Sequence, residues 1–237
     1  MIKRIKSGVH WFDDLIGGGY TPNSINLLAG GTGTGKTIFC LQFLYNGAKD
    51  FNEKGIYISF EESNEDLKQD AAEIGFNFST LGDKVKFLHI PPYQITDFLN
   101  VLKEEVLIFD PKRLVLDSIS ALSMPMEDDF ERRKQLYRIK ELLKSLNCTS
   151  VLISEAPSEA SMSTETASRF SRYDVEEFLC DSVTALYYAG IGGESDRAIR
   201  VIKMRKTAHN RAPIPMEIGK LGIRVLSEKA EDSIGNL

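Results

Sequence analysis

The chain has 237 residues, of which 42% are hydrophobic and 27% charged, and both fractions are typical of a folded globular protein. This length favours one domain over residues 1–237, with a frayed polar tail at 227–237. The formal net charge of −5 argues against a dedicated DNA or RNA binder, because such proteins carry positive charge where they meet phosphates. The N-terminus has no signal-peptide pattern and no apolar run could span a membrane, so we expect a cytoplasmic protein.

Short β-branched segments alternate with longer segments of helical periodicity up to about residue 155. The alternation predicts right-handed βαβ units and a mostly parallel sheet with helices on both faces. After a long polar loop the pattern becomes strand-rich, which predicts a C-terminal antiparallel extension of this α/β fold. The predicted strands are 24–30, 55–60, 85–90, 113–119, 150–155, 182–188 and 197–205; the helices are 36–51, 64–75, 96–109 and 130–147; the loop is 156–171 and a hairpin is 214–226.

Residues 30–37 read GGTGTGKT and match G-x-x-x-x-G-K-[ST], the Walker A pattern of a phosphate-binding loop. Its glycines let the backbone N–H groups converge on an anion, and the following helix adds the positive end of its dipole. We expect Lys36 to reach the β- and γ-phosphates of ATP and Thr37 to ligate Mg²⁺. A plain flexible turn is the weaker interpretation, because a buried strand precedes the motif and a helix follows it. The predicted ATP-binding residues are Gly31, Thr32, Gly33, Thr34, Gly35, Lys36, Thr37 and Ile38.

The segment Arg113–Asp117, RLVLD, has the form of the matching Walker B strand. An aspartate at the carboxyl end of a buried parallel strand lies near the phosphates and can hold Mg²⁺ through water. Taken alone, the pattern fits equally well an aspartate that caps the next turn. A phosphate-binding loop in the same chain favours Asp117 as a magnesium ligand.

Two further motifs resemble those of RecA-like ATPases, and the KaiC family most closely. The first is Phe60-Glu61-Glu62-Ser63, and the second is KMRKTAH at 203–209. The similarity extends over nearly the whole chain and implies a RecA-like P-loop NTPase fold. Circadian KaiC has two such domains in tandem, so this chain resembles a single-domain KaiC-like ATPase of archaeal type. Further similar segments are 7–19, 42–47, 57–67, 116–118 and 173–178.

The resemblance implies that Glu61 is the catalytic glutamate, with Glu62 as its helper and Lys36 beside them. A carboxylate at this place can orient and polarise the water that attacks the γ-phosphate. The alternative is that these acids only decorate a helix N-terminus, where negative charge is favoured. We keep that alternative for Glu65 and Asp66, and favour catalysis for Glu61.

Lys203 and Arg205 are two residues apart in a predicted strand, so they project from one face. In the family the corresponding pair enters the nucleotide site of the neighbouring subunit. In the family, the residues matching Thr207 and His209 lie beside this pair. The residue matching Met204 contributes mainly its backbone. The resemblance therefore implies a homo-oligomer, a hexameric ring. The alternative, a solvated basic strand, is kept for Arg197 and Arg200.

Three hypotheses about function follow: a Mg²⁺-dependent ATPase ring whose nucleotide state regulates an unidentified protein partner, a RecA- or RadA-like DNA-binding recombinase, and a nucleotide-sensing module with negligible turnover. The loops at 126–129 and 156–180, which bind DNA in RecA relatives, are acidic here and would repel nucleic acid. The turn at 218–222 lacks an acidic residue that circadian KaiC has, which leaves base preference open. The resemblance does not extend to autophosphorylation, which is left open, because the phosphorylated sites belong to KaiC's second domain.

Overall fold

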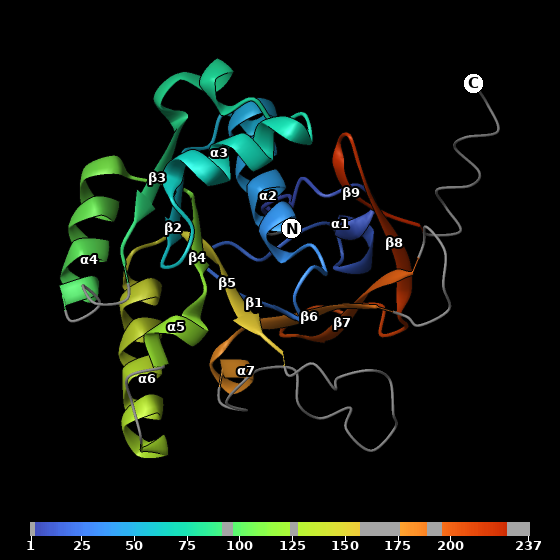
Figure 1. Ribbon diagram of the computed structural model, residues 1–237. Coiled ribbons are helices and arrows are strands. Elements are labelled where there is room, and N and C mark those ends of the chain that lie inside the picture. Colours follow the sequence, from blue (N-terminus) through green and yellow to red (C-terminus); the bar gives the residue numbers. More distant parts are fainter. Residues whose placement is uncertain (1–2, 92–96, 124–127, 157–175, 189–195, 227–237) are drawn as a thin grey trace.

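The computed structural model describes residues 3–91, 97–123, 128–156, 176–188 and 196–226 (Figure 1). Nine strands join one sheet in the order β3-β2-β4-β5-β1-β6-β7-β8-β9. All pairs from β3 to β6 are parallel, and the pairs from β6 to β9 are antiparallel. The strands are β1 Ile25–Gly30, β2 Gly55–Ser59, β3 Val85–His89, β4 Arg113–Asp117, β5 Thr149–Glu155, β6 Ser182–Tyr188, β7 Arg197–Met204, β8 Ile214–Gly219 and β9 Gly222–Val225.

Helices cover both faces of this sheet, and successive residues of each central strand therefore enter different cores. In β1, Leu28 packs with α2 and α3, whereas Leu27 packs with α4 and α6 on the other face. Because both faces are covered, β1 and β2 are buried at every position rather than at every second one, and they are mostly apolar. The helices are α1 Phe12–Leu15, α2 Lys36–Phe51, α3 Asn64–Glu73, the 3₁₀ helix η1 Phe78–Lys84, α4 Phe98–Phe109, α5 Ile119–Ser123, α6 Asp129–Ser145 and α7 Glu176–Leu179.

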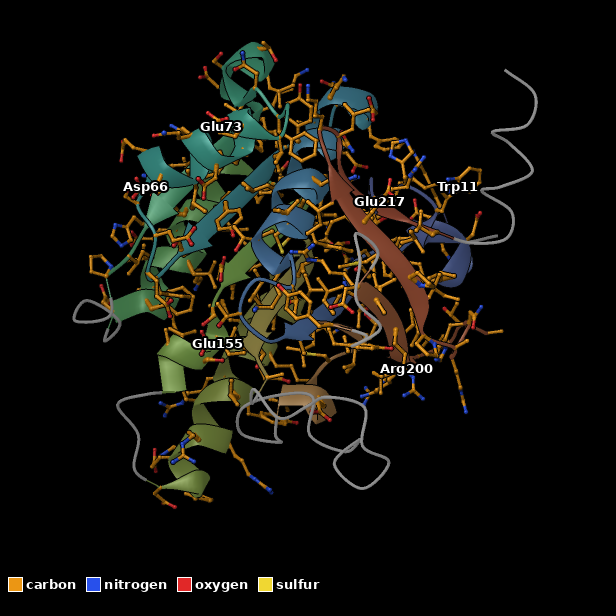
Figure 2. The ribbon with its side chains drawn as sticks, turned by 45° about the vertical axis from the view of Figure 1, so that its right-hand side comes forward. Trp11, Asp66, Glu73, Glu155, Arg200 and Glu217 are labelled. Atoms are coloured by element: carbon orange, nitrogen blue, oxygen red, sulfur yellow. The ribbon has the colours of Figure 1, made fainter. Side chains whose placement is uncertain are left out.

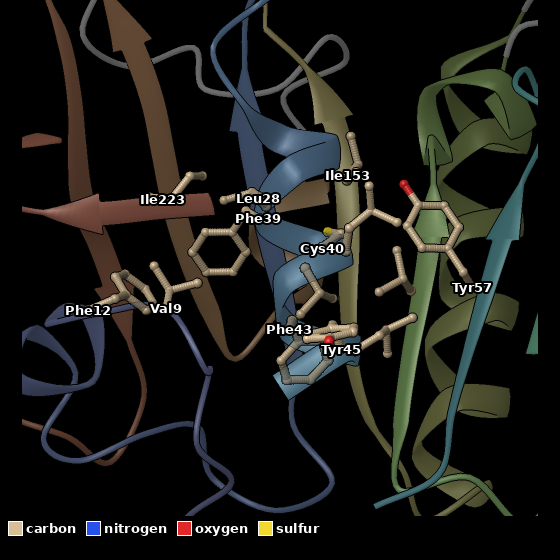
Figure 3. Packing of buried hydrophobic residues seen from close by; sticks show 14 of the residues in the cluster. Val9, Phe12, Leu28, Phe39, Cys40, Phe43, Tyr45, Tyr57, Ile153 and Ile223 are labelled. Atoms are coloured by element: carbon tan, nitrogen blue, oxygen red, sulfur yellow. The ribbon is translucent and has the colours of Figure 1, made fainter. Parts of the chain in front are cut away.

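Helix α2 is the central packing element on its face of the sheet (Figure 3). Phe39 and Phe43 are fully buried, and Phe39 meets Phe12 edge-on with ring centroids 5.2 Å apart. Gln42, also buried, accepts a hydrogen bond from the Ile223 N–H and so fastens the helix to β9. The first turn of α2, which follows the Walker A glycines, is thereby held rigidly against the sheet.

The predicted fold, a mostly parallel sheet flanked by helices with a C-terminal antiparallel extension, is confirmed. The strand predicted at 113–119 ends earlier, at Asp117, because the short helix α5 begins at Ile119. Most of the loop predicted at 156–171, and the tail 227–237, lie outside the described residues. Among the described helices, none combines the length and apolarity needed to cross a membrane.

Candidate nucleotide site

The Walker A loop links the carboxyl end of β1 to the first turn of α2. Gly33 and Gly35 have φ values of +74° and +104°, which a residue with a side chain rarely adopts. A Cβ on Gly30 would lie 2.5 Å from the Leu186 carbonyl oxygen, so β6 approaches the loop too closely for any other residue. Inside the loop, Lys36 Nζ and Thr34 Oγ1 both donate to the Gly31 carbonyl oxygen, at 2.8 and 2.9 Å. The sequence thus builds a tight loop with its lysine folded inward.

Asp117 ends β4 at the same edge of the sheet. Tyr57 donates its hydroxyl hydrogen to Asp117 Oδ2 at 2.5 Å. Burial raises the pKa of Asp117 from 3.8 to about 6, although the Tyr57 hydrogen bond, Lys36 and a hydrogen bond with Thr37 oppose that rise. Asp117 and Thr37, both predicted as magnesium ligands, are therefore close enough to interact. Hydroxyl and carboxylate oxygens suit this hard cation, so the residues present fit the ion.

Lys36 lies among acidic groups from three parallel strands. Burial lowers its pKa, while Asp117 and then Glu155 act in the opposite direction, followed by smaller contributions that include Glu61. Glu155, labelled in Figure 2, ends β5 beside the last residue of β1. The carboxyl edge of the sheet thus combines the partly buried ammonium group of Lys36 with several carboxylates. Such a site can hold an anion and a divalent cation together.

The glutamate pair begins the connection from β2 to α3. The backbone N–H groups of Glu61 and Glu62 donate to Ser59 Oγ at 3.3 and 2.9 Å, and both side chains are exposed. Although Glu62 is exposed as a residue, partial desolvation of its carboxyl group raises its pKa, and Asp117 adds to the effect.

The cap of α3 is a different residue. Ser63 Oγ accepts from the Asp66 N–H, and the acids of the first turn are Glu65 and Asp66. The helix-decoration interpretation therefore describes Glu65 and Asp66. Glu61 and Glu62 precede the cap, at the edge of the sheet where β4 and β1 also end.

The residues predicted to act on a neighbouring subunit lie at the opposite edge. Met204 pairs with Ser182, and Ser182 pairs with Asn26 near the start of β1, whereas the Walker A loop follows the end of β1. A strand rises about 3.3 Å per residue, so most of the length of β1 lies between the basic motif and the Walker A loop of the same chain. The structure thus brings Lys36, Thr37, Asp117 and Glu61 together and leaves the basic motif apart.

The basic motif is ordered by the N-terminal segment. Arg4 donates to Thr207 Oγ1 at 2.9 Å and to the Gly19 carbonyl at 3.0 Å. Lys203 Nζ donates to the Glu177 carbonyl at 2.9 Å, and His209 Nε2 is a buried polar atom with no hydrogen-bond partner in the described chain. The strand ends at Met204, so Arg205 lies in the turn that follows rather than in the strand.

Three residues near the loop were not singled out from the sequence: Glu155, Tyr188 and Arg197. Tyr188 donates its hydroxyl hydrogen to the Gly33 carbonyl at 2.9 Å. Arg197 donates to the same oxygen at 3.4 and 3.5 Å, a solvent-exposed contact that its assignment to a solvated basic strand did not predict. No motif marks these residues. Glu155 and Tyr188 could have been found only from their positions at the ends of strands that pair with β1. The sequence does not show which strands pair with β1, so this signal could not be used.

Comparisons with known proteins agree with one another. A family model described as "ATPase: KaiC" matches residues 5–230. The circadian clock oscillator protein KaiC of Parasynechococcus marenigrum (strain WH8102) is 30% identical over 94% of this chain and 45% of its own length. KaiC of Synechococcus elongatus is 28% identical over 94% and 44%. The crystal structure of a KaiC-like protein from the archaeon Pyrococcus horikoshii OT3 superposes with a TM-score of 0.83, at 33% identity over 96% of this chain and 100% of that one. The chain spans less than half the length of these curated relatives.

Proposed function

The chain belongs to the KaiC family of P-loop ATPases, and from this premise we propose that it binds ATP with Mg²⁺ and hydrolyses it. The observation that carries the proposal is the convergence of Lys36, Thr37, Asp117 and Glu61 at the carboxyl edge of the parallel strands. Open α/β sheets bind their ligands at that edge. We further propose that residues 1–237 form one domain, since all nine described strands join a single sheet.

The phosphates are bound by the loop. Residues 31–38 present backbone N–H groups at the N-terminus of α2, where the helix dipole favours an anion. When ATP is present, Lys36 exchanges its hydrogen bond to the Gly31 carbonyl for the β- and γ-phosphates. Bound Mg²⁺ would neutralise charge on the phosphate oxygens, with Thr37 and, through water, Asp117 holding it.

Glu61 is proposed to orient the attacking water, with Glu62 as its helper. Its position between β2 and the cap of α3 puts it at the end of a strand that neighbours β4, and it contributes to the electrostatics of both Lys36 and Asp117. A carboxylate that accepts the proton of water makes the oxygen a better nucleophile.

We propose an oligomeric ring, a hexamer, in which Lys203, Met204, Arg205, Thr207 and His209 contact the ATP of the neighbouring subunit. The support is their place at the amino edge of the sheet, away from their own loop. A cation at the γ-phosphate stabilises charge that develops there during transfer. The nucleotide state of the ring would then be read by a regulated protein partner.

Nucleic acid is not proposed as a ligand. The acidic loops on which this rests, 126–129 and 156–180, lie mostly outside the described residues, and the argument is the one from charge. The recombinase hypothesis predicts tight DNA binding that weakens steeply with salt. The ATPase hypothesis predicts almost none at physiological salt.

The test is Lys36→Ala, with Lys49→Ala as its matched control on the same helix. Binding of a fluorescent ATP analogue and release of phosphate would be measured for the parent and both variants, with a thermal melt for each. We expect the Lys36 variant to lose both activities and the exposed Lys49 variant to keep them. Unchanged binding and hydrolysis in Lys36→Ala would refute the site. Binding without hydrolysis in the parent would identify the nucleotide-sensing module instead.

A further inference from the structure

Strand β6 carries a tyrosine to the Walker A loop. Gly30 of β1 pairs with Leu186 of β6, so Tyr188, two residues further on, lies over the part of the loop that follows Gly30. Its hydroxyl donates to the Gly33 carbonyl at 2.9 Å. Tyr188 pairs in turn with Arg197 of β7, whose guanidinium lies 5.3 Å from the centre of the tyrosine ring. Two strands outside the motif thus hold one peptide group inside it.

That peptide group has a consequence for anion binding. In a planar trans peptide the C=O and the next N–H point in opposite directions. When Tyr188 and Arg197 draw the Gly33 oxygen toward β6 and β7, the Thr34 N–H is turned to the other side, into the loop. A phosphate-binding loop depends on such inward N–H groups.

Glycine makes this orientation changeable. Gly33 has φ of +74°, and glycine populates several backbone regions at similar cost, so the Gly33–Thr34 peptide has no intrinsic reason to keep one orientation. The neighbouring Thr34 side chain is already engaged with the Gly31 carbonyl and does not hold the Gly33 oxygen. The hydroxyl of Tyr188 provides the hold that the loop sequence lacks.

We propose that Tyr188 is a positioning residue of the nucleotide site. Supported by Arg197, it fixes the Gly33–Thr34 peptide so that the Thr34 N–H faces the phosphates, and it thereby strengthens the binding of both ATP and ADP. The inference rests on the proposed function, because it assumes that the loop binds nucleotide.

Tyr188→Phe is the direct test, since it removes the hydroxyl and keeps the ring beneath Arg197. We expect the dissociation constants for ATP and ADP to rise by about 2- to 10-fold, as for loss of one neutral hydrogen bond. Both nucleotides are affected, because the loop N–H groups cradle phosphates that they share. The matched control is Tyr187→Phe, the next residue of the same strand, which should leave both constants unchanged.

A second variant makes the contact itself visible. A Cβ on Gly33 would lie 2.9 Å from the Tyr188 hydroxyl oxygen, so Gly33→Ala conflicts with this oxygen besides straining the backbone. We expect Gly33→Ala to weaken nucleotide binding. In the double variant, adding Tyr188→Phe should weaken binding no further, or should restore part of the lost affinity. Independent roles would instead give additive losses.

The outcomes distinguish a failure of the proposed nucleotide binding from a failure of the role proposed for Tyr188. If the parent binds neither nucleotide, the proposed function and this inference both fail. If the parent binds and Tyr188→Phe binds equally well, only the inference fails. It also fails if the loss is confined to ATP, if Tyr187→Phe shows the same loss, or if Tyr188→Phe lowers the melting temperature of the nucleotide-free protein as its main effect.

Discussion

The parallel strands and the antiparallel extension place their polar residues in different environments. Strands β1 and β2 are buried along their whole length, and β4, which pairs with β2, ends in the partly buried Asp117. Strands β7 and β8 mix buried positions with partly or fully exposed ones, and basic residues such as Arg200 project from β7 (Figure 2). Charge at the end of the parallel strands therefore lies at the rim of a buried sheet, where it is partly shielded from water. Charge on the extension is available to another molecule.

Strand β7 joins these two settings. Its first residue, Arg197, contacts the Walker A loop of its own chain, and its last residues lie beside the amino ends of β6 and β1. The antiparallel direction of β7 is what separates the basic motif from its own loop. In the proposed ring, β7 would therefore contact the Walker A loop of its own chain at one end and lead to the residues that reach a neighbouring site at the other.

Of the substitutions considered, Arg205→Ala should have the largest effect on the rate of ATP hydrolysis. If Arg205 serves a neighbouring site, the substitution should slow hydrolysis by about 10³- to 10⁵-fold, the range for arginine fingers, while each subunit still binds ATP. Arg200→Ala is the control, since Arg200 lies on β7 and donates to the Arg211 carbonyl. Phosphate release at saturating ATP gives the rate.

Mixing variants shows whether the effect crosses between subunits. A Lys36→Ala subunit has no working site but offers Arg205, and an Arg205→Ala subunit has the reverse defect. Mixed assemblies should regain hydrolysis that neither variant has alone. A mixture that assembles yet stays inactive, or a fully active monomer, would mean that the extension does not act on a neighbour.

Glu61→Gln tests the site at the ends of the parallel strands, without changing the antiparallel extension. The amide keeps the shape of the side chain and cannot accept a proton, so we expect hydrolysis to fall by about 10²- to 10⁴-fold with ATP binding retained. Glu62→Gln, one residue away, should have the smaller effect. A larger loss in Glu62→Gln would reverse the assignment of the pair, and unchanged rates in both would assign these glutamates a structural role.

The sequence predicted the parallel half well because its signals are local. Helix α2 was predicted with its observed ends, Lys36–Phe51, since a phosphate-binding loop fixes where the helix begins. The short helices α1, α5 and α7 were not predicted, because four or five residues contain too little of a helical repeat. β4 was extended too far because Ser118 and Ile119 continue a β-like pattern.

The site was predictable to the extent that its residues belong to motifs. Lys36, Thr37 and Asp117 were found from spacing and context, whereas the basic motif was identified by resemblance alone. Tyr188 could not be found, because its contact depends on which strand lies next to β1 and on the register of that pair. The contact of Arg197 with the loop was not predicted for the same reason, because the sequence does not show which residues lie beside this half-exposed strand.

The smallest expected effect concerns Asp117, at the end of the parallel strands. It is a dependence of the free energy of unfolding on pH. Without Mg²⁺ or nucleotide, the pKa of Asp117 is about 6 in the folded protein against 3.8 as the ordinary value. The folded state therefore binds more protons than the unfolded state between these values, and stability falls as the pH rises from about 4 to about 6. Because each pKa unit corresponds to about 1.4 kcal/mol, the fall amounts to about 3 kcal/mol.

Urea unfolding of the metal-free protein at a series of pH values measures this fall. Asp117→Asn keeps an acceptor for the Tyr57 hydroxyl and should reduce the slope between pH 4 and 6, leaving the part that comes from groups such as Glu62, whose pKa is also raised. Asp110→Asn is the control, because the Asp110 side chain is 85% exposed and its substitution should leave the slope intact. Saturating Mg²⁺ should weaken the slope in the parent by favouring the ionised carboxylate. A parent slope equal to that of Asp117→Asn would mean that this carboxylate is better solvated than the fold implies. The desolvation assigned to the end of β4 would then have to be abandoned at the residue proposed to hold the metal.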